Sequence, residues 1–95
     1  MNTHPALLPK FGGTGMYGRR VHEAVLDAGE SQSGVTIHLV DEIYDNGSIL
    51  AQCVVPVLPG DSVETLAQRV TVREREFVVE TLEDIVAERI PLLTR

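Results

Sequence analysis

Residues 35–40 read VTIHLV and residues 48–58 read SILAQCVVPVL, and these two runs decide the fold of the chain. Both are apolar and rich in β-branched residues, which favour strands. The segment Asp45-Asn46-Gly47 between them is a turn signal. The simplest arrangement is therefore an antiparallel pair of strands, joined by a loop longer than a tight hairpin. Pro56 restricts the far end of the second strand to a sheet edge or to the strand's exit.

Helical patterns lie on both sides of this strand pair. Apolar residues recur with helical spacing over residues 21–28, and Gly29 suits a C-terminal stop, so a short helix is expected there. Asp61 and Glu64 have the spacing of a capping box, which predicts a long helix from Ser62 towards Ile90. The apolar stripe of this helix predicts a buried side made of Leu66, Val70, Val78, Leu82, Ile85 and Val86.

Composition narrows the classes of function. The chain has 95 residues, enough for one domain with a modest core. Its net charge of −6 disfavours nucleic acid as a partner, because an acidic surface and a phosphate backbone repel each other. No apolar run approaches the ~20 residues of a membrane helix, so no membrane span is expected. The first residues show no secretory pattern and the single Cys53 cannot form an internal disulfide, which favours the cytoplasm.

The first residues of the chain carry candidate chemistry. Asn2 and His4 flank Thr3 in an extended segment, so both side chains should point to the same side. A carboxamide and an imidazole are donors of the kind that an oxyanion hole uses when a carbonyl group is attacked. Both are also common loop residues, and the Pro- and Gly-rich segment from His4 to Arg20 predicts a long loop. The catalytic and the structural interpretation both stay open at this point.

Two carboxylates, like Asn2 and His4, have both a structural and a functional interpretation. Asp45 is a good turn former, but beside His4 it would favour the imidazolium form and raise the pKa of His4. Glu74 interrupts the apolar stripe of the long helix, so it either pairs with a local Arg or faces a ligand. His38, inside an apolar strand, is expected as a hydrogen-bonded core histidine, and His22 is given no role. The three histidines share no ligand spacing, so no metal site is expected.

The same residues also resemble a known family. The segments that carry the resemblance are Asn2–Lys10, Thr36–Val40, Asp45–Gly47, Gln52 and Val55–Asp61. Together they resemble the phosphoribosylglycinamide formyltransferase family over nearly the whole chain. The resemblance implies an enzyme of de novo purine synthesis, which passes a formyl group from 10-formyltetrahydrofolate to the amine of glycinamide ribonucleotide. Both ligands are small molecules, and no metal is implied.

Roles for particular residues follow from this resemblance. Asn2, His4 and Asp45 would be catalytic: Asn2 and His4 would polarise the formyl group, while Asp45 would sustain protonated His4 and organise a water that relays the proton. The folate would be bound by Asn2, Asp41, Glu42, Ile43, Tyr44 and Asp45. The ribonucleotide would be bound by Pro5, Thr71, Val72, Arg73 and Glu74.

The expected fold class is α/β, as the C-terminal portion of a Rossmann-like formyltransferase fold. Its parts are a catalytic loop, a short helix, an antiparallel strand pair and a long C-terminal helix, so that residues 1–95 form a single partial domain. The family's N-terminal nucleotide-binding half is expected to be absent. The main hypothesis is formyl transfer. The alternative is a truncated, inactive module that self-associates as a homodimer or pairs with another chain, such as the missing N-terminal half.

Overall fold

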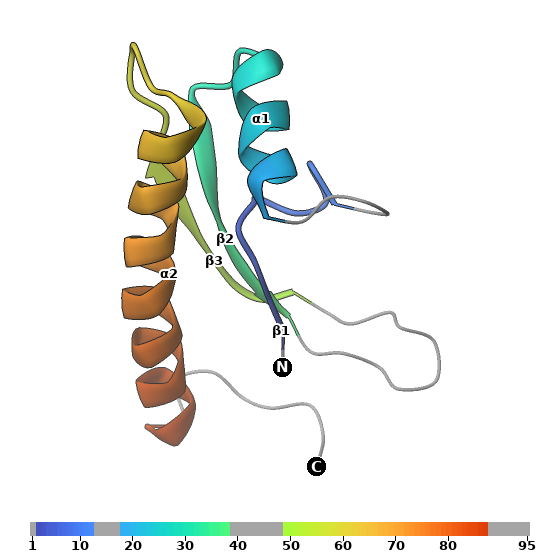
Figure 1. Cartoon of the computed structure of the whole chain (residues 1–95). Helices are drawn as coiled ribbons and strands as arrows, with labels where there is room; N and C mark the ends of the chain where they lie inside the picture. The colour runs from blue at the N-terminus through green and yellow to red at the C-terminus, as the bar shows by residue number, and fades with distance from the viewer. Residues whose placement is uncertain (1, 13–17, 39–48, 88–95) are drawn as a thin grey trace.

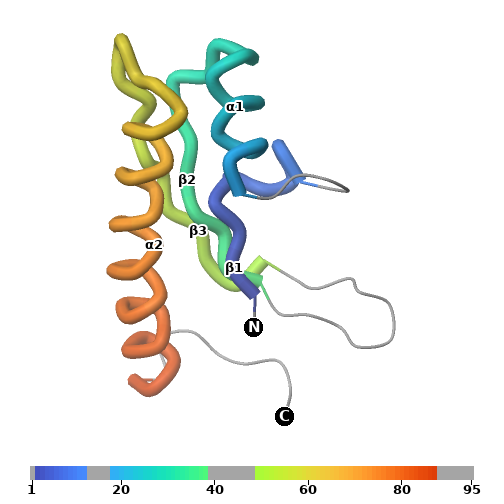
Figure 2. The backbone as a smooth tube through the Cα atoms, viewed as in Figure 1, coloured from blue at the N-terminus to red at the C-terminus, as the bar shows by residue number. Residues whose placement is uncertain are grey.

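The computed structural model describes residues 2–12, 18–38 and 49–87. Its elements, in chain order, are β1 (Asn2–His4), α1 (Arg19–Asp27), β2 (Gln32–His38), β3 (Ile49–Pro56) and α2 (Val63–Val86). The three strands form one sheet in the order β1-β2-β3, and both pairings are antiparallel. Figures 1 and 2 show the strands side by side, with α2 running along them. The predicted antiparallel pair is confirmed, and β3 ends at Pro56 as expected.

Strand β1 corrects the sequence interpretation, which placed a catalytic loop at the start of the chain and only two strands in the sheet. Asn2 pairs with His38, Thr3 with Ile37 and His4 with Thr36, so the two candidate catalytic residues lie on a strand. Three residues carry too little periodicity to predict a strand, because the pairing depends on a partner more than 30 residues away. The other boundaries differ from the predicted ones by one to four residues.

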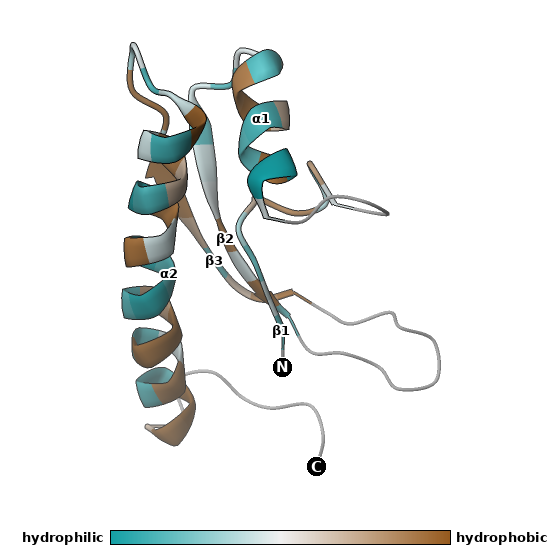
Figure 3. Cartoon of the chain, viewed as in Figure 1, coloured by the Kyte–Doolittle hydropathy of each residue, from teal (hydrophilic) through white to brown (hydrophobic). Residues whose placement is uncertain are grey.

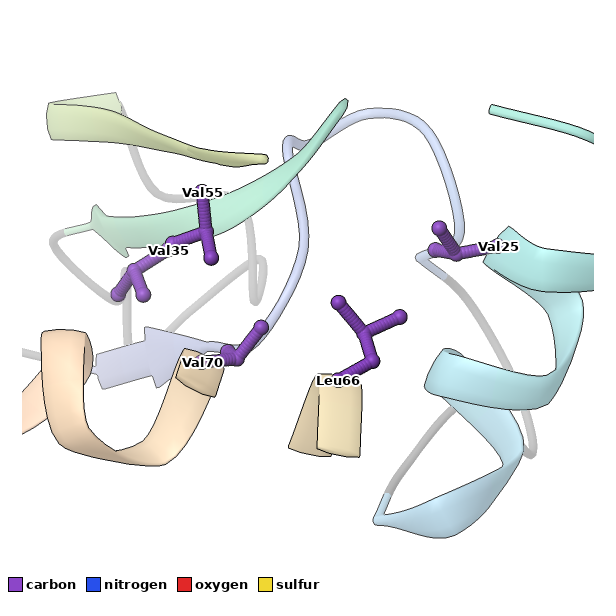
Figure 4. Packing of buried hydrophobic residues seen from close by; sticks show 5 residues of the cluster. All are labelled: Val25, Val35, Val55, Leu66 and Val70. Atoms are coloured by element: carbon purple, nitrogen blue, oxygen red, sulfur yellow. The ribbon is translucent and has the colours of Figure 1, made fainter. Parts of the chain in front are cut away.

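The sheet has one face towards α2 and one away from it. Val35 and Val55 pack with Leu66 and Val70 of α2 in the core, which α1 joins through Val25 (Figure 4). Side chains alternate between the two faces along a strand. The face opposite α2 is therefore formed by the residues between these valines and their partners in register: Asn2, His4, Gly34, Thr36, His38, Gln52 and Val54.

Helix α2 begins one residue later than the predicted capping box. Ser62 is the N-cap, with extended backbone angles, and its hydroxyl accepts a hydrogen bond from the Thr65 N–H. Asp61 instead accepts hydrogen bonds from the Leu58 N–H (2.7 Å) and the Thr65 hydroxyl (2.8 Å). Its two oxygens also accept from the guanidinium of Arg69 at 2.7 and 2.9 Å. Asp61 therefore fixes the turn that leads from β3 into α2, and the cap itself belongs to Ser62.

The buried side of α2 agrees with the prediction only in its first half. Leu66 and Val70 are fully buried, but Leu82 is 44% exposed and Val86 is 84% exposed, while Thr81 is buried. The sheet-facing stripe therefore turns away from the predicted line after Val70. Val78 and Ile85, which also belong to the predicted side, are half-buried. Figure 3 shows brown, hydrophobic segments among teal ones in the second half of α2. Within the described ranges, neither helix is long and apolar enough to span a membrane.

Candidate active site

Strand β1 presents Asn2 and His4 on the same face of the sheet. They are two residues apart on a strand, and both pair in register with β2, which confirms that their side chains share a side. The Oδ1 atom of Asn2 accepts a hydrogen bond from the Thr3 N–H at 3.0 Å. The Asn2 side chain is exposed, and its amide NH₂ group can donate hydrogen bonds. The site therefore offers an amide donor and, two residues on, an imidazole.

His4 is paired with His38. Their Nε2 atoms are 2.6 Å apart, and the two rings stack with centroids 4.6 Å apart at an interplanar angle of 28°. One ring must donate and the other accept, so at least one Nε2 atom carries no proton. Burial, and then the charge of His38, lower the pKa of His4 from its ordinary value. Among the described residues, the surroundings of His4 favour the neutral imidazole.

His38 is thus a site residue that the sequence interpretation missed. It was expected as a core histidine, but it is half-buried and lies against His4. The reason is the register of β1, because the pairing of Asn2 with His38 places His38 diagonally next to His4. Thr36 and Gln52 belong to the same row, since His4 pairs with Thr36 and Thr36 pairs with Gln52. No local pattern marks these residues; only a correct prediction of β1 would have found them.

The four α2 residues expected at the ribonucleotide do not share one face of the helix. Successive residues are about 100° apart on an α-helix, so four in a row surround it. Thr71 is exposed and lines a hollow between the two helices together with His22. Val72 is 50% exposed and lines a different hollow. Thr71 and Val72 therefore lie over two separate hollows.

Arg73 is engaged within its own helix. Its guanidinium donates two hydrogen bonds of 3.0 Å to Glu80 and lies 3.5 Å from Glu76. It also lies over the ring of Phe77, 5.5 Å from the centroid. The hydrogen bonds to Glu80 are the main cause of the raised pKa of Arg73, to which the charges of Cys53 and Glu76 add. A ligand phosphate would have to compete with two carboxylates for this side chain.

Glu74 occupies a different environment. It is half-buried and lies four residues after Val70 and seven before Thr81, both of which are buried, so it belongs to the sheet-facing stripe. No hydrogen bond or ion pair joins its carboxylate to another of the described residues. The first of the two interpretations of Glu74 required an ion pair with a nearby arginine. No such pair is formed among the described residues.

The sheet separates Glu74 from His4. Helix α2 covers the face that carries Val35 and Val55, while Asn2 and His4 lie on the opposite face. The described structure therefore does not bring the two expected groups into contact. Pro5 follows directly after β1 and is half-buried.

The expected folate segment lies outside the described residues. This applies to Asp41, Glu42, Ile43 and Tyr44, and to the third catalytic candidate, Asp45. Among the residues that are described, no group of three or more His, Cys, Asp or Glu side chains is placed to hold a metal ion. His22 is buried, and the pKa of its imidazole is lowered by that burial.

Residues 1–82 match the family described as Formyl transferase. The chain belongs to this family. It is 56% identical over 89 residues to the chloroplastic phosphoribosylglycinamide formyltransferase of Vigna unguiculata, covering 94% of this chain and 28% of that protein. It is also 50% identical over 82 residues to the phosphoribosylglycinamide formyltransferase of Mycobacterium tuberculosis, covering 83% of this chain and 34% of the relative.

Solved structures agree with the family membership. The structure of phosphoribosylglycinamide formyltransferase from Anaplasma phagocytophilum superposes with a TM-score of 0.79 at 34% identity, over 98% of this chain and 43% of that one. A formyltetrahydrofolate deformylase from Pseudomonas syringae superposes equally well, with a TM-score of 0.79 at 27% identity, over 98% of this chain and 30% of that one. The chain thus spans less than half the length of these family members, and the expected formyltransferase fold is confirmed for the part that it covers.

Proposed function

We propose that this formyltransferase chain takes part in the transfer of a formyl group from 10-formyltetrahydrofolate to the amine of glycinamide ribonucleotide. The observation that carries the proposal is the placement of Asn2 and His4 on one face of β1, at the start of a chain that is 56% identical to a phosphoribosylglycinamide formyltransferase. The compartment expected from the sequence is the cytoplasm, whereas the Vigna relative is named as chloroplastic.

The reaction needs donors for a developing oxyanion. When an amine attacks a formyl carbon, the formyl oxygen gains negative charge, and preorganised N–H groups stabilise it. The Asn2 amide donates one such hydrogen bond because its Oδ1 atom is already engaged by Thr3. The His4 imidazole would donate the second from the ring nitrogen that is not engaged with His38. Two N–H donors on one face suit a single carbonyl oxygen, and this is the chemical fit between the described residues and the formyl donor.

The remaining roles follow from the family. Asp45 would hold His4 in its protonated form and organise the water that carries the proton from the attacking amine to the leaving nitrogen of the folate. Asn2 and residues 41–45 would bind the folate. The His4–His38 pair acts against this protonation, because His38 lowers the pKa of His4, so the role of Asp45 requires that its carboxylate outweigh the effect of His38.

The ribonucleotide would lie against Pro5 and the segment Thr71–Glu74. Within this segment the best supported binding residue is Glu74, because it is half-buried and its carboxylate has no partner among the described side chains. A carboxylate in that position can accept hydrogen bonds from ribose hydroxyls or from the glycinamide amine. Arg73 forms ion pairs with Glu76 and Glu80, so it would contribute less to ribonucleotide binding.

Replacement of His4 by Ala tests the proposal. Formyl transfer should fall by about 10²- to 10⁴-fold in the His4→Ala variant, which is the usual contribution of an acid–base group. The rate is measured by following folate product formation, with the chain alone and with the N-terminal segment of the Mycobacterium tuberculosis relative supplied as a second polypeptide. Gln68→Ala, an exposed change on α2, serves as the control. An unchanged rate in His4→Ala would remove His4 from the mechanism.

The alternative function is that of an inactive module that associates with itself or with another chain. The exposed apolar side chains of α2 favour it, because such surfaces mark interaction sites. The same variant distinguishes the two functions. In the first, His4→Ala strongly lowers turnover; in the second, the unmodified chain has no turnover to lose and His4→Ala leaves association unchanged.

A further inference from the structure

A small hydrogen-bonded network ties the segment after His4 to the sheet. The Thr36 hydroxyl donates to the Ala6 carbonyl oxygen (2.6 Å) and accepts from the Leu8 N–H (3.1 Å). The Gln52 side-chain NH₂ group donates to the Leu8 carbonyl oxygen (2.8 Å) and to the Thr36 hydroxyl oxygen (3.0 Å). We refer to Thr36 and Gln52, with the backbone of Ala6 and Leu8, as the clamp.

The clamp uses the full hydrogen-bonding capacity of the Thr36 hydroxyl. A hydroxyl has one proton to donate and two lone pairs, and here the proton goes to Ala6 while the lone pairs accept from Leu8 and Gln52. Thr36 is fully buried, so a lost partner would not be replaced by bulk water without cost. Gln52 also supplies the donor to the Leu8 carbonyl, which makes it the part of the clamp that spans from β3 to the segment after β1.

The position of the clamp links it to His4. His4, Thr36 and Gln52 form one row across the three strands, on the same face of the sheet. Strand β1 has only three residues and ends at His4. Its own ladder is too short to hold that end firmly, so the contacts made two and four residues later by Ala6 and Leu8 restrict how far His4 can move.

Packing over Gly34 adds to this restriction. A Cβ atom at Gly34 would meet the Leu7 side chain and the carbonyl oxygen of Cys53. Leu7 therefore lies directly on the backbone of β2, between the two residues that the clamp holds. The segment is fixed by packing at Leu7 and by hydrogen bonds on either side of it.

We propose that Gln52 is a positioning residue for His4, acting through the Leu8 carbonyl and the Thr36 hydroxyl. The catalytic part of this proposal rests on the proposed formyl transfer. Gln52 does not touch a substrate; it holds the segment that follows β1, and so keeps the imidazole of His4 aligned with the Asn2 amide. A small displacement of a positioned catalytic group lowers the rate by up to about 10²-fold.

Two substitutions separate hydrogen-bond donation from packing. Gln52→Ala removes the side chain, while Gln52→Glu keeps its shape but replaces the NH₂ group by an acceptor. We expect both to lower kcat by about 10- to 10²-fold with KM changed less than twofold, and to shift the His4 ring ¹⁵N resonances of the folded chain. Gln68→Ala and Gln68→Glu, the same changes at an exposed position of α2, should have neither effect.

The two readouts fail independently. If the unmodified protein transfers no formyl group, the proposed function fails, but the His4 resonances still test the clamp. If Gln52→Glu keeps the resonances and the kcat of the unmodified protein, donation by Gln52 is dispensable and the proposal is overturned. A loss of thermal stability in both Gln52 variants with unchanged His4 resonances would also overturn it, because Gln52 would then serve stability alone.

Discussion

At the scale of single residues, the environment of His4 is set by its neighbours rather than by its own segment. Partial burial and the adjacent His38 both lower the pKa of its imidazole. The sequence interpretation had Asp45 raise that pKa, but Asp45 lies outside the described residues. The two influences have opposite signs, so a titration of His4 decides which of them dominates in the folded protein.

We expect His4 to titrate below its ordinary value of about 6.5. Because the folded pKa is depressed, the neutral ring contributes stability that is present above pH 6.5 and lost as the pH falls through the folded pKa. In a His38→Phe variant the pKa of His4 should rise towards 6.5, since one of the two lowering causes is removed. NMR titration of the ring resonances measures both values. A His4 pKa above 6.5 in the unmodified protein would instead support the Asp45 hypothesis.

Gly34 offers a test of packing at the same scale. Its missing side chain leaves room for Leu7, and an added Cβ would also meet the backbone of β3, which cannot move without breaking the sheet. Gly34→Ala should therefore lower the free energy of unfolding by about 1–3 kcal/mol, as overpacked cores do. Gly12→Ala is the matched control, because its Cβ would meet mainly the flexible end of the Leu8 side chain. Urea unfolding should give a lower midpoint for Gly34→Ala than for Gly12→Ala. Equal midpoints for the two variants would show that Gly34 is not packed in this way.

At the scale of elements, the junction between β3 and α2 depends on one carboxylate. Asp61 accepts hydrogen bonds from Leu58, Thr65 and Arg69, and its side chain is only 4% exposed. The guanidinium of Arg69 is the main reason that the pKa of Asp61 lies well below its usual range. The start of α2, and with it the place of Leu66 and Val70 in the core, is held by this charged contact.

Replacing Asp61 by Asn should therefore change the acid sensitivity of the fold. A carboxylate with a depressed folded pKa stabilises the protein above its unfolded value, about 3.9, and loses that contribution as the pH falls further. The unmodified protein should be more stable than Asp61→Asn at pH 7, and the difference should shrink as the pH falls below about 4. Urea midpoints measured from pH 7 to pH 3 test this. Glu83→Gln, an exposed change on α2, is the control. Its difference in stability from the unmodified protein should not shrink in this way as the pH falls below about 4.

At the scale of the whole molecule, α2 has apolar residues on a side that no described element covers. Val72, Val79, Leu82 and Val86 are between 44% and 84% exposed, and all four lie on this one helix. The family members that the chain matches are more than twice its length. Such a surface is costly in water and favours association, either with a second copy or with further protein.

We expect the chain to self-associate in solution through this surface. The double substitution Val79→Glu and Leu82→Glu should shift the population towards monomer, because it places two charges in the apolar patch. Sedimentation velocity over a range of protein concentrations measures the change. Gln68→Glu adds a charge elsewhere on α2 and is the control. A chain that is monomeric at high concentration without any substitution would contradict this expectation.

Local sequence patterns determined much of the architecture. The β-branched runs predicted β2 and β3, the helical spacing and Gly29 predicted α1, and an alternation of two residues placed Asn2 and His4 on one side. Each of these depends on neighbours in the sequence, where backbone sterics and side-chain periodicity act. The family resemblance, carried by short ordered motifs, is likewise confirmed.

Tertiary structure alone decided what surrounds His4. The pairing of β1 with β2 brings His38, Thr36 and Gln52 to it, from positions 32 to 48 residues away in the sequence. It also decided that Thr81 rather than Leu82 is buried on α2, and that α2 covers the face opposite His4. Register and the side from which a helix approaches are set by contacts between distant segments, and these leave no periodic trace in either segment by itself.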